Sequence, residues 1–141
     1  MRIMAIDYGD ARTGVAVSDP TGLLAGFTTV IRGHRPEEVA AEVAQLAEAH
    51  GVAELVLGLP RNMDGTEGPR AERCRGFAQE LERASGLPVT LWDERRTTIE
   101  AHAILHESGK KMKAHKKNVD AVAATLILEG YLVKKRMERG L

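Results

Sequence analysis

The chain has 141 residues, of which 43% are hydrophobic and 28% are charged, and its 20 basic and 20 acidic side chains cancel. This composition is typical of a globular protein, and the length predicts one domain over residues 1–141. A neutral chain is not a generally basic nucleic-acid binder, although a local basic surface is compatible with it. The sole cysteine, Cys74, cannot form an intramolecular disulfide. Without a recognisable signal peptide or membrane-spanning segment, we expect a cytoplasmic protein that does not contact membranes.

The first part of the chain predicts three strands joined by short connections. Residues 2–7 and 13–19 form apolar or alternating runs, and Gly9 and Asp10 between them are typical of a hairpin turn. A third strand is predicted over residues 23–31, which include the strand-forming segment "TTVI". Strands with such short connections pair in antiparallel fashion.

Helices and strands alternate in the remainder of the chain. The pattern predicts helices that start near Pro36, Pro69, Thr97 and Asn118, and strands over 53–60 and 87–92. The first two of these helices end before Gly51 and Gly86, and the last two extend to about Glu107 and Met137. Helices between the later strands imply parallel crossovers, so the sequence predicts an α/β fold with a mixed sheet covered by helices.

Acidic residues stand where three of these elements begin or end. Asp7 ends the first strand, Asp93 and Glu94 follow the last strand, and Asp120 lies near the start of the final helix. Sites in α/β sheets form beyond the carboxyl ends of the parallel strands. Carboxylates from three elements are suitable ligands for Mg²⁺ or Mn²⁺, and two such ions promote phosphodiester hydrolysis. Each acid has an ordinary alternative as a turn, cap or surface residue, and that is the role we expect for Asp10 and Asp19.

Four segments in this order resemble the signature blocks of the YqgF family: "IDYGDARTGVAVSD", "LVLGLPRNMDGTEG", "DERRTT" and "KKNVDAVAATLILEGYL". Members of this family are ribonuclease H-like proteins named as Holliday junction resolvases or as nucleases of pre-16S rRNA. The resemblance spans nearly the whole chain. It implies a ribonuclease H-like fold, in which a five-stranded mixed sheet has three antiparallel strands first and helices on both faces.

The resemblance also implies roles for the acidic residues. Asp7 would be the ligand from the first strand and Asp120 the ligand from the last helix. Related resolvases of the RuvC type take a further acid from the end of the fourth strand, where this chain reads "LGLPRNMDG" and has no acid before Asp64. One acid of "DER" is then the better candidate, and we favour Glu94 over Asp93 because alternate strand residues face opposite ways.

Several polar residues are candidates for contacts with nucleic-acid phosphates. The two threonines lie near a predicted helix start, where anions bind, and the lysines form the basic run "KKMKAHKK" before Asp120. Capping and simple solvation are the alternative roles. With aromatic residues at only 4%, we expect binding led by backbone and shape. The candidates are Arg12, Asn62, Arg95, Thr97, Thr98, Lys110, Lys111, Lys113, Lys116 and Lys117.

The favoured hypothesis is a metal-dependent nuclease that acts on structured nucleic acid, with maturation of the 5′ end of pre-16S rRNA as its first candidate reaction. Ribosomal particles would then be partners. The alternative within this class is a Holliday junction resolvase, which needs a homodimer because it cuts two strands; the sequence leaves monomer and dimer open. Two other classes are an actin-like ATPase relative, which needs a second domain, and a catalytically silent RNA-binding assembly factor.

Overall fold

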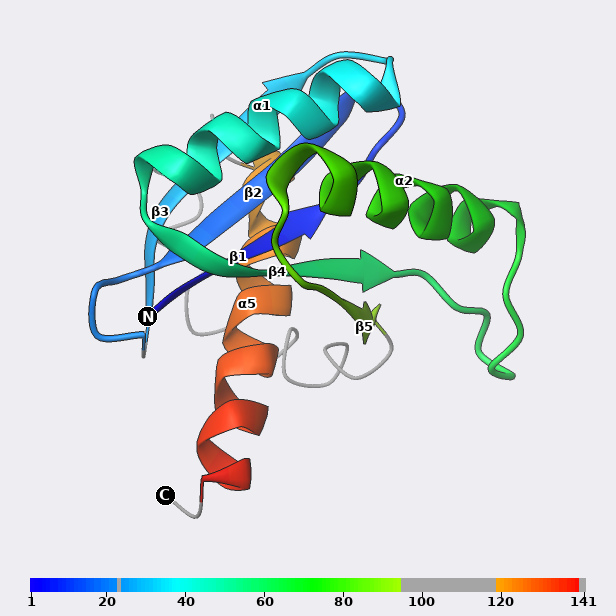
Figure 1. The fold of residues 1–141 in the computed structure, drawn as a ribbon. Helices are drawn as coiled ribbons and strands as arrows, with labels where there is room; N and C mark the ends of the chain where they lie inside the picture. Colours follow the sequence, from blue (N-terminus) through cyan, green and yellow to red (C-terminus); the bar gives the residue numbers. More distant parts are fainter. Residues whose placement is uncertain (23, 95–118, 140–141) are drawn as a thin grey trace.

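The computed structural model describes residues 1–22, 24–94 and 119–139, with the backbone alone at positions 119 and 120. Five strands form one sheet, and three described helices pack on it (Figure 1). The strands are β1 (Arg2–Asp7), β2 (Arg12–Ser18), β3 (Ala25–Arg32), β4 (Val52–Leu59) and β5 (Val89–Asp93). The helices are α1 (Pro36–Ala49), α2 (Pro69–Ser85) and α5 (Val119–Glu138).

The sheet has the order β3-β2-β1-β4-β5. Strands β1, β2 and β3 pair in antiparallel fashion, whereas β4 runs parallel to both β1 and β5. The carboxyl ends of β1, β4 and β5 therefore meet at one edge of the sheet, which we call the carboxyl edge. The predicted mixed sheet, with three antiparallel strands followed by two parallel ones, is confirmed.

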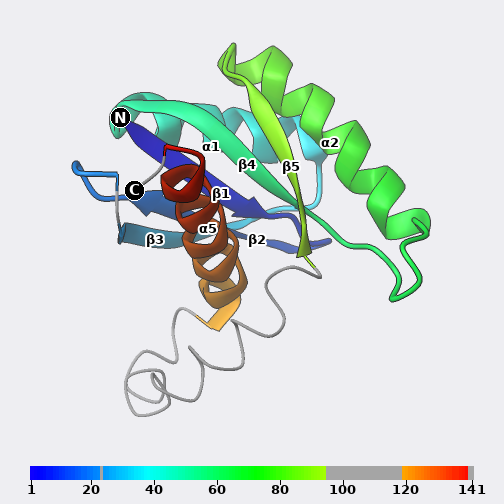
Figure 2. The ribbon, with the colours of Figure 1, turned by 90° about the horizontal axis from the view of Figure 1, so that it is seen from below.

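Helices cover both faces of the sheet, as Figures 1 and 2 show, with α1 and α2 on one face and α5 on the other. Side chains of β1 alternate between two cores: Met4 and Ile6 pack with α1 and α2, whereas Ile3 and Ala5 pack with α5. The alternation is the ordinary two-residue repeat of a strand. It also decides on which side of the sheet each residue at the carboxyl edge lies.

Most element boundaries agree with the sequence. Helices α1 and α2 each begin at a proline, which suits the first helical position because it donates no backbone hydrogen bond. Strand β3 begins later than predicted, at Ala25, because the Asp19 backbone amide donates to the carbonyl of Leu24 and the Gly22 amide donates to the carbonyl of Asp19 in a turn. The predicted helix from Thr97 lies outside the described residues. Among the helices that are described, none has the length and apolar content to cross a bilayer.

Helix α5 runs antiparallel to β4. Its Lys135 ammonium lies 3.6 Å from the Glu54 carboxylate near the start of β4, and Tyr131 donates a hydrogen bond to the same carboxylate. One to two turns earlier in the helix, Ile127 packs beside Gly58 near the end of β4. The first turn of α5, which contains Asp120, therefore lies toward the carboxyl edge (Figure 2).

Candidate functional site

Two carboxylates meet at the carboxyl edge. Asp7 is the last residue of β1, and Glu94 follows the last residue of β5. Asp7 continues the alternation of Ile3 and Ala5 on the α5 face. Glu94 lies on the same face, because its carboxylate and Ile127 of α5 both border Gly58. The Glu94 carboxyl group donates a hydrogen bond to the Asp7 carboxylate, and both residues are half-buried.

The surroundings of Glu94 make its charged form unfavourable. Burial raises the pKa of Glu94 to about 7, and the negative charge of Asp7, the hydrogen bond with Asp7 and the charge of Asp93 act in the same direction. Arg70, in the first turn of α2, lowers this pKa only in part. Below about pH 7 the Asp7–Glu94 pair therefore holds a proton where a cation would be electrostatically favoured.

The absence of a side chain at Gly58 makes room for Glu94. A Cβ atom built on Gly58 would lie 2.5 Å from Glu94 Oε1 and 2.6 Å from Ile127 Cδ1, both closer than real contacts allow. The Glu94 carboxylate thus occupies the space over the end of β4 that a side chain of β4 would fill. This is the part of β4 at which the sequence lacks an acid.

Asp93 points to the opposite side of the sheet from Glu94. Its neighbour in the repeat, Leu91, packs in the core formed with α1 and α2. Arg61, two residues after the end of β4, places Nη1 3.8 Å from Asp93 Oδ2. The structure thus brings Glu94, and not Asp93, to Asp7.

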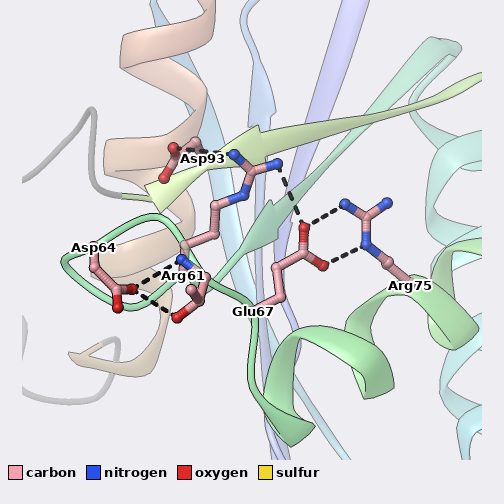
Figure 3. Close-up of polar contacts among 6 residues, drawn as sticks. Arg61, Asp64, Glu67, Arg75 and Asp93 are labelled. Atoms are coloured by element: carbon pink, nitrogen blue, oxygen red, sulfur yellow. Dashed lines mark hydrogen bonds and ion pairs between the residues drawn. The ribbon is translucent and has the colours of Figure 1, made fainter.

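Ionic contacts link Asp93 to helix α2, as Figure 3 shows. Besides contacting Asp93, the Arg61 guanidinium lies 3.5 Å from Glu67, just before α2. Glu67 in turn accepts two hydrogen bonds of 2.6 Å from Arg75, in the second turn of α2. The sequence prediction named Asp93 but not Arg61, Glu67, Arg70 or Arg75, which lie in the segment after β4 or in the first two turns of α2.

The turn after β1 is also attached to α2. Tyr8 stacks on Phe77 with ring centroids 3.9 Å apart and an interplanar angle of 8°. Arg73 donates a 2.8 Å hydrogen bond to Asp10, so Asp10 is a surface partner within the turn. The turn requires glycine at position 9, because a Cβ there would lie 2.2 Å from the Arg12 carbonyl oxygen.

Asp19, Cys74 and Asp120 lie outside the contact between Asp7 and Glu94 as far as the structure describes them. Asp19 has the turn role expected for it, since its carboxylate accepts hydrogen bonds from Thr21 and the backbone of Leu24. Cys74 is buried in α2, and burial raises the pKa of its thiol to about 11, so its thiolate is scarce near neutral pH. Asp120 is the second residue of α5, and its side chain lies outside the description. Over residues 1–22, 24–94 and 121–139, no three His, Cys, Asp or Glu side chains gather as a metal cluster.

The predicted nucleic-acid contacts fall in two groups. Arg12 is exposed at the start of β2, and Asn62 is exposed in the loop after β4, where its amide donates to the Thr66 hydroxyl at 2.9 Å. The other predicted contacts lie outside the described residues: Arg95, Thr97, Thr98, Lys110, Lys111, Lys113, Lys116 and Lys117.

Comparison with known proteins identifies the family. A family model described as RuvX, Holliday junction resolvase, matches residues 1–134. The chain belongs to this family. It is the YqgF family that the sequence motifs predicted. A protein of Halothermothrix orenii named "Putative pre-16S rRNA nuclease" is 46% identical over 132 residues, which are 94% of each chain. A protein of the same name from Lachnospira eligens is 45% identical over 139 residues, 96% of this chain and 99% of the other.

The fold matches that of a solved resolvase. RuvC of Thermus thermophilus, in a structure titled as a complex with a Holliday junction substrate, aligns with a TM-score of 0.73 at 12% identity. The alignment covers 98% of this chain and 96% of that one. It confirms the predicted ribonuclease H-like fold. Membership of the RuvX family confirms the predicted enzyme class, a nuclease that hydrolyses phosphodiester bonds.

Proposed function

We propose that this nuclease matures the 5′ end of pre-16S rRNA and that Asp7, Glu94 and Asp120 hold the Mg²⁺ or Mn²⁺ ions it needs. The RNA target is carried over from the names of relatives that are about 45% identical over nearly the whole chain. Such a protein works in the cytoplasm on rRNA precursors or ribosomal particles.

One observation carries the assignment of the site: the carboxyl groups of Asp7 and Glu94 lie in hydrogen-bonding contact at the carboxyl edge. Two carboxylates from different strands have been brought into contact, and burial together with the Asp7 charge raises the pKa of Glu94 to about 7. Such an arrangement lowers the stability of the fold unless a bound cation offsets the repulsion, and like-charged pairs of this kind cluster at functional sites. In a structural pair, one of the two positions would instead carry a basic or apolar side chain.

The donor set suits a hard divalent cation. Carboxylate oxygens are the ligands that Mg²⁺ and Mn²⁺ prefer, and Gly58 leaves the space in which the Glu94 carboxylate reaches Asp7. When bound, such an ion supplies an activated water and positive charge for phosphodiester hydrolysis. Asp7 and Glu94 would then orient the site, and Arg70 adds positive charge beside it.

Asp120 is the third ligand of the proposal. It lies in the first turn of α5, which runs antiparallel to β4 and begins toward the carboxyl edge. Position 120 also precedes Ala124 by four residues and Ile127 by seven, so it belongs to the same helical row as these buried residues. Helix position and register therefore support a role for Asp120 beside Asp7 and Glu94.

A second candidate reaction is the resolution of Holliday junctions. It is favoured by the description of the family model and by the likeness of the fold to RuvC. A resolvase cuts two strands and therefore needs two copies of the site, so this candidate requires a homodimer. The pre-rRNA reaction is compatible with a monomer.

The test is a comparison of cleavage by the wild type and Asp7→Asn with Mn²⁺, Mg²⁺ or EDTA. The substrates are a 16S rRNA precursor fragment with its 5′ extension, a single-stranded RNA of equal length and a four-way DNA junction. We expect metal-dependent cutting of the precursor and a loss of at least about a hundredfold in Asp7→Asn. Asp10→Asn is the matched control, because Asp10 lies in the same turn but pairs with Arg73 at the surface.

The outcomes separate the candidates. Symmetric cutting of the junction, together with a dimer in analytical ultracentrifugation, would replace the rRNA reaction with resolution. Equal activity of Asp7→Asn and the wild type would refute the assignment of the site. Binding of RNA without cleavage under any metal condition would support the silent assembly factor instead.

A further inference from the structure

We propose that Arg61 is a positioning residue, which holds the carboxyl end of β5 through Asp93 and thereby directs Glu94 toward Asp7. The inference rests on the proposed function, in which Asp7 and Glu94 are parts of the same site. It assigns a role to the segment between β4 and α2, from which no catalytic residue was predicted.

The backbone pairing of β5 with β4 ends just before Glu94. Among the described residues, β5 is the edge strand of the sheet and pairs with β4 alone, and the last pair of this ladder joins Asp93 to Leu59. Glu94 follows this pair, so strand pairing alone does not fix its direction. The side chain of Asp93, the last residue of β5, offers an anchor by which this end can be held.

Arg61, in the loop that follows β4, contacts the Asp93 side chain. Its Nη1 lies 3.8 Å from Asp93 Oδ2 and its Nη2 lies 3.5 Å from Glu67 Oε2. The Arg61 and Asp93 side chains are only 32% and 17% exposed, so their interaction is screened less than that of a surface pair. Arg61 thus joins the end of β5 to the residue just before α2.

The other end of the connection is firmly held. Arg75 donates from Nε and Nη2 to the two oxygens of Glu67, both at 2.6 Å, in the two-pronged geometry that gives arginine–carboxylate pairs their directionality. Arg75 belongs to α2, whose buried side packs on the sheet through residues that include Phe77 and Leu81. The ionic chain of Arg75, Glu67, Arg61 and Asp93 therefore connects a packed helix to the end of an edge strand (Figure 3).

The position of Asp93 constrains the direction of the residue that follows it. Asp93 is the last residue of the extended strand, and Glu94 is joined to it directly. When Arg61 holds Asp93 on the side of α2, Glu94 is turned to the side of α5, where Gly58 leaves room and Asp7 accepts its hydrogen bond. Loss of the Arg61 contact lets the end of β5 rotate and take Glu94 away from Asp7.

The competing role for Arg61 is direct contact with a phosphate of the substrate. In that role Arg61 does not need Asp93, and removal of Asp93 frees the guanidinium for the phosphate. The two roles therefore predict opposite relations between substitutions at positions 61 and 93.

The experiment is a double-mutant cycle on the full chain with Arg61→Gln, Asp93→Asn and the combined variant, measured as kcat, KM and Mn²⁺ affinity. We expect each single substitution to lower kcat about tenfold and to change KM less than twofold, with the double variant no worse than either single one. Arg61→Lys should recover part of kcat, because it keeps the charge but not the contact with two acids. Arg83→Gln is the matched control, because Arg83 is an exposed arginine of α2 that pairs with Glu80 at 3.2 Å outside the ionic chain of Arg61.

Two results would overturn the proposal. One is a loss of kcat in the double variant equal to the product of the losses in the two single variants, which would mean that Arg61 and Asp93 act independently. The other is an increase of KM in Arg61→Gln with Asp93→Asn unaffected, which would instead assign Arg61 to the substrate.

A second measurement separates this inference from the proposed function. The carboxyl ¹³C resonance of Glu94, assigned by its loss in Glu94→Gln, is recorded at pH 5 without metal, so far below the pKa of about 7 that loss of the Asp93 charge alone leaves Glu94 protonated. Arg61→Gln and Asp93→Asn should displace it in the same direction, and Arg83→Gln should not. If the wild type cleaves nothing and this resonance still responds, the proposed function fails and the positioning role stands; an unmoved resonance refutes the positioning role whether or not the protein cleaves.

Discussion

The ends of β1 and β5 present the two candidate carboxylates in the same way but are held by different forces. In both strands the acid faces α5 while its neighbour faces α2: Tyr8 beside Asp7, and Asp93 beside Glu94. Tyr8 is held by stacking on the buried ring of Phe77. Asp93 is held by Arg61, which depends in turn on Glu67 and Arg75.

The difference follows from the place of each strand in the sheet. Strand β1 is central and pairs with β2 and β4, so the end that carries Asp7 is already constrained and an apolar contact completes it. Strand β5 lies at the edge and ends one residue before Glu94. An apolar stack contributes to global stability, whereas the partly buried Arg61–Asp93 pair, 3.8 Å apart, contributes less to it and acts on the local geometry of the strand end. We therefore expect the β1 contact to matter mostly for folding and the β5 contact mostly for activity.

The largest effect should follow from removal of the apolar contact. Phe77→Ala deletes a fully buried ring and its stack with Tyr8, and we expect it to lower the free energy of unfolding by about 3–5 kcal/mol. Urea denaturation measures this change. Arg75→Gln, on the same helix, should leave the denaturation midpoint nearly unchanged, and equal losses in the two variants would contradict the contrast drawn here.

A smaller effect is expected where β4 makes room for Glu94. Gly58→Ala places a methyl group against Glu94 Oε1 and Ile127 Cδ1, both of which are ends of flexible side chains that can shift. We expect cleavage to fall about tenfold while the free energy of unfolding falls by only about 1 kcal/mol. Gly76→Ala, with nothing within 4 Å of the added Cβ, is the control and should raise stability slightly, as alanine does in helices. Unchanged cleavage in Gly58→Ala would show that the position of Glu94 is unimportant.

The smallest effect concerns the pH dependence of stability. Because the pKa of Glu94 is raised from 4.5 to about 7, the native metal-free protein keeps a proton that the unfolded chain releases. The contribution of Glu94 to stability must then decline as pH rises from about 4.5 through 7 and level off above that range. Glu94→Gln removes this decline, so the variant should match the wild type at pH 5 and exceed it by about 1 kcal/mol at pH 8, a value reduced for partial exposure.

The measurement is denaturation in EDTA at both pH values, with Glu42→Gln on the exposed surface of α1 as control. An equal difference between Glu94→Gln and the wild type at pH 5 and pH 8 would mean that Glu94 does not titrate in this range. It would also mean that the end of β5 does not hold its carboxyl group against Asp7.

The sequence by itself determined most of the fold. Proline at positions 36 and 69, the alternation in β1 and β2 and the continuous apolar run of β4 are local signals, because each depends only on the geometry of its own element. They predicted the order of elements and the mixed sheet that the structure contains. They also placed Asp7 and Glu94 at strand ends, and the family motifs named them together with Asp120.

The tertiary structure decided how these residues are presented. Contact between Asp7 and Glu94 depends on the insertion of β4 between β1 and β5, and on a missing side chain at Gly58. The role proposed for Arg61 follows from its contact with Asp93 on one side of the sheet while Glu94 contacts Asp7 on the other. No periodic pattern in the sequence marked Arg61. Such pairings join residues far apart in the chain, so their energies arise only once sheet order and helix packing have brought them together.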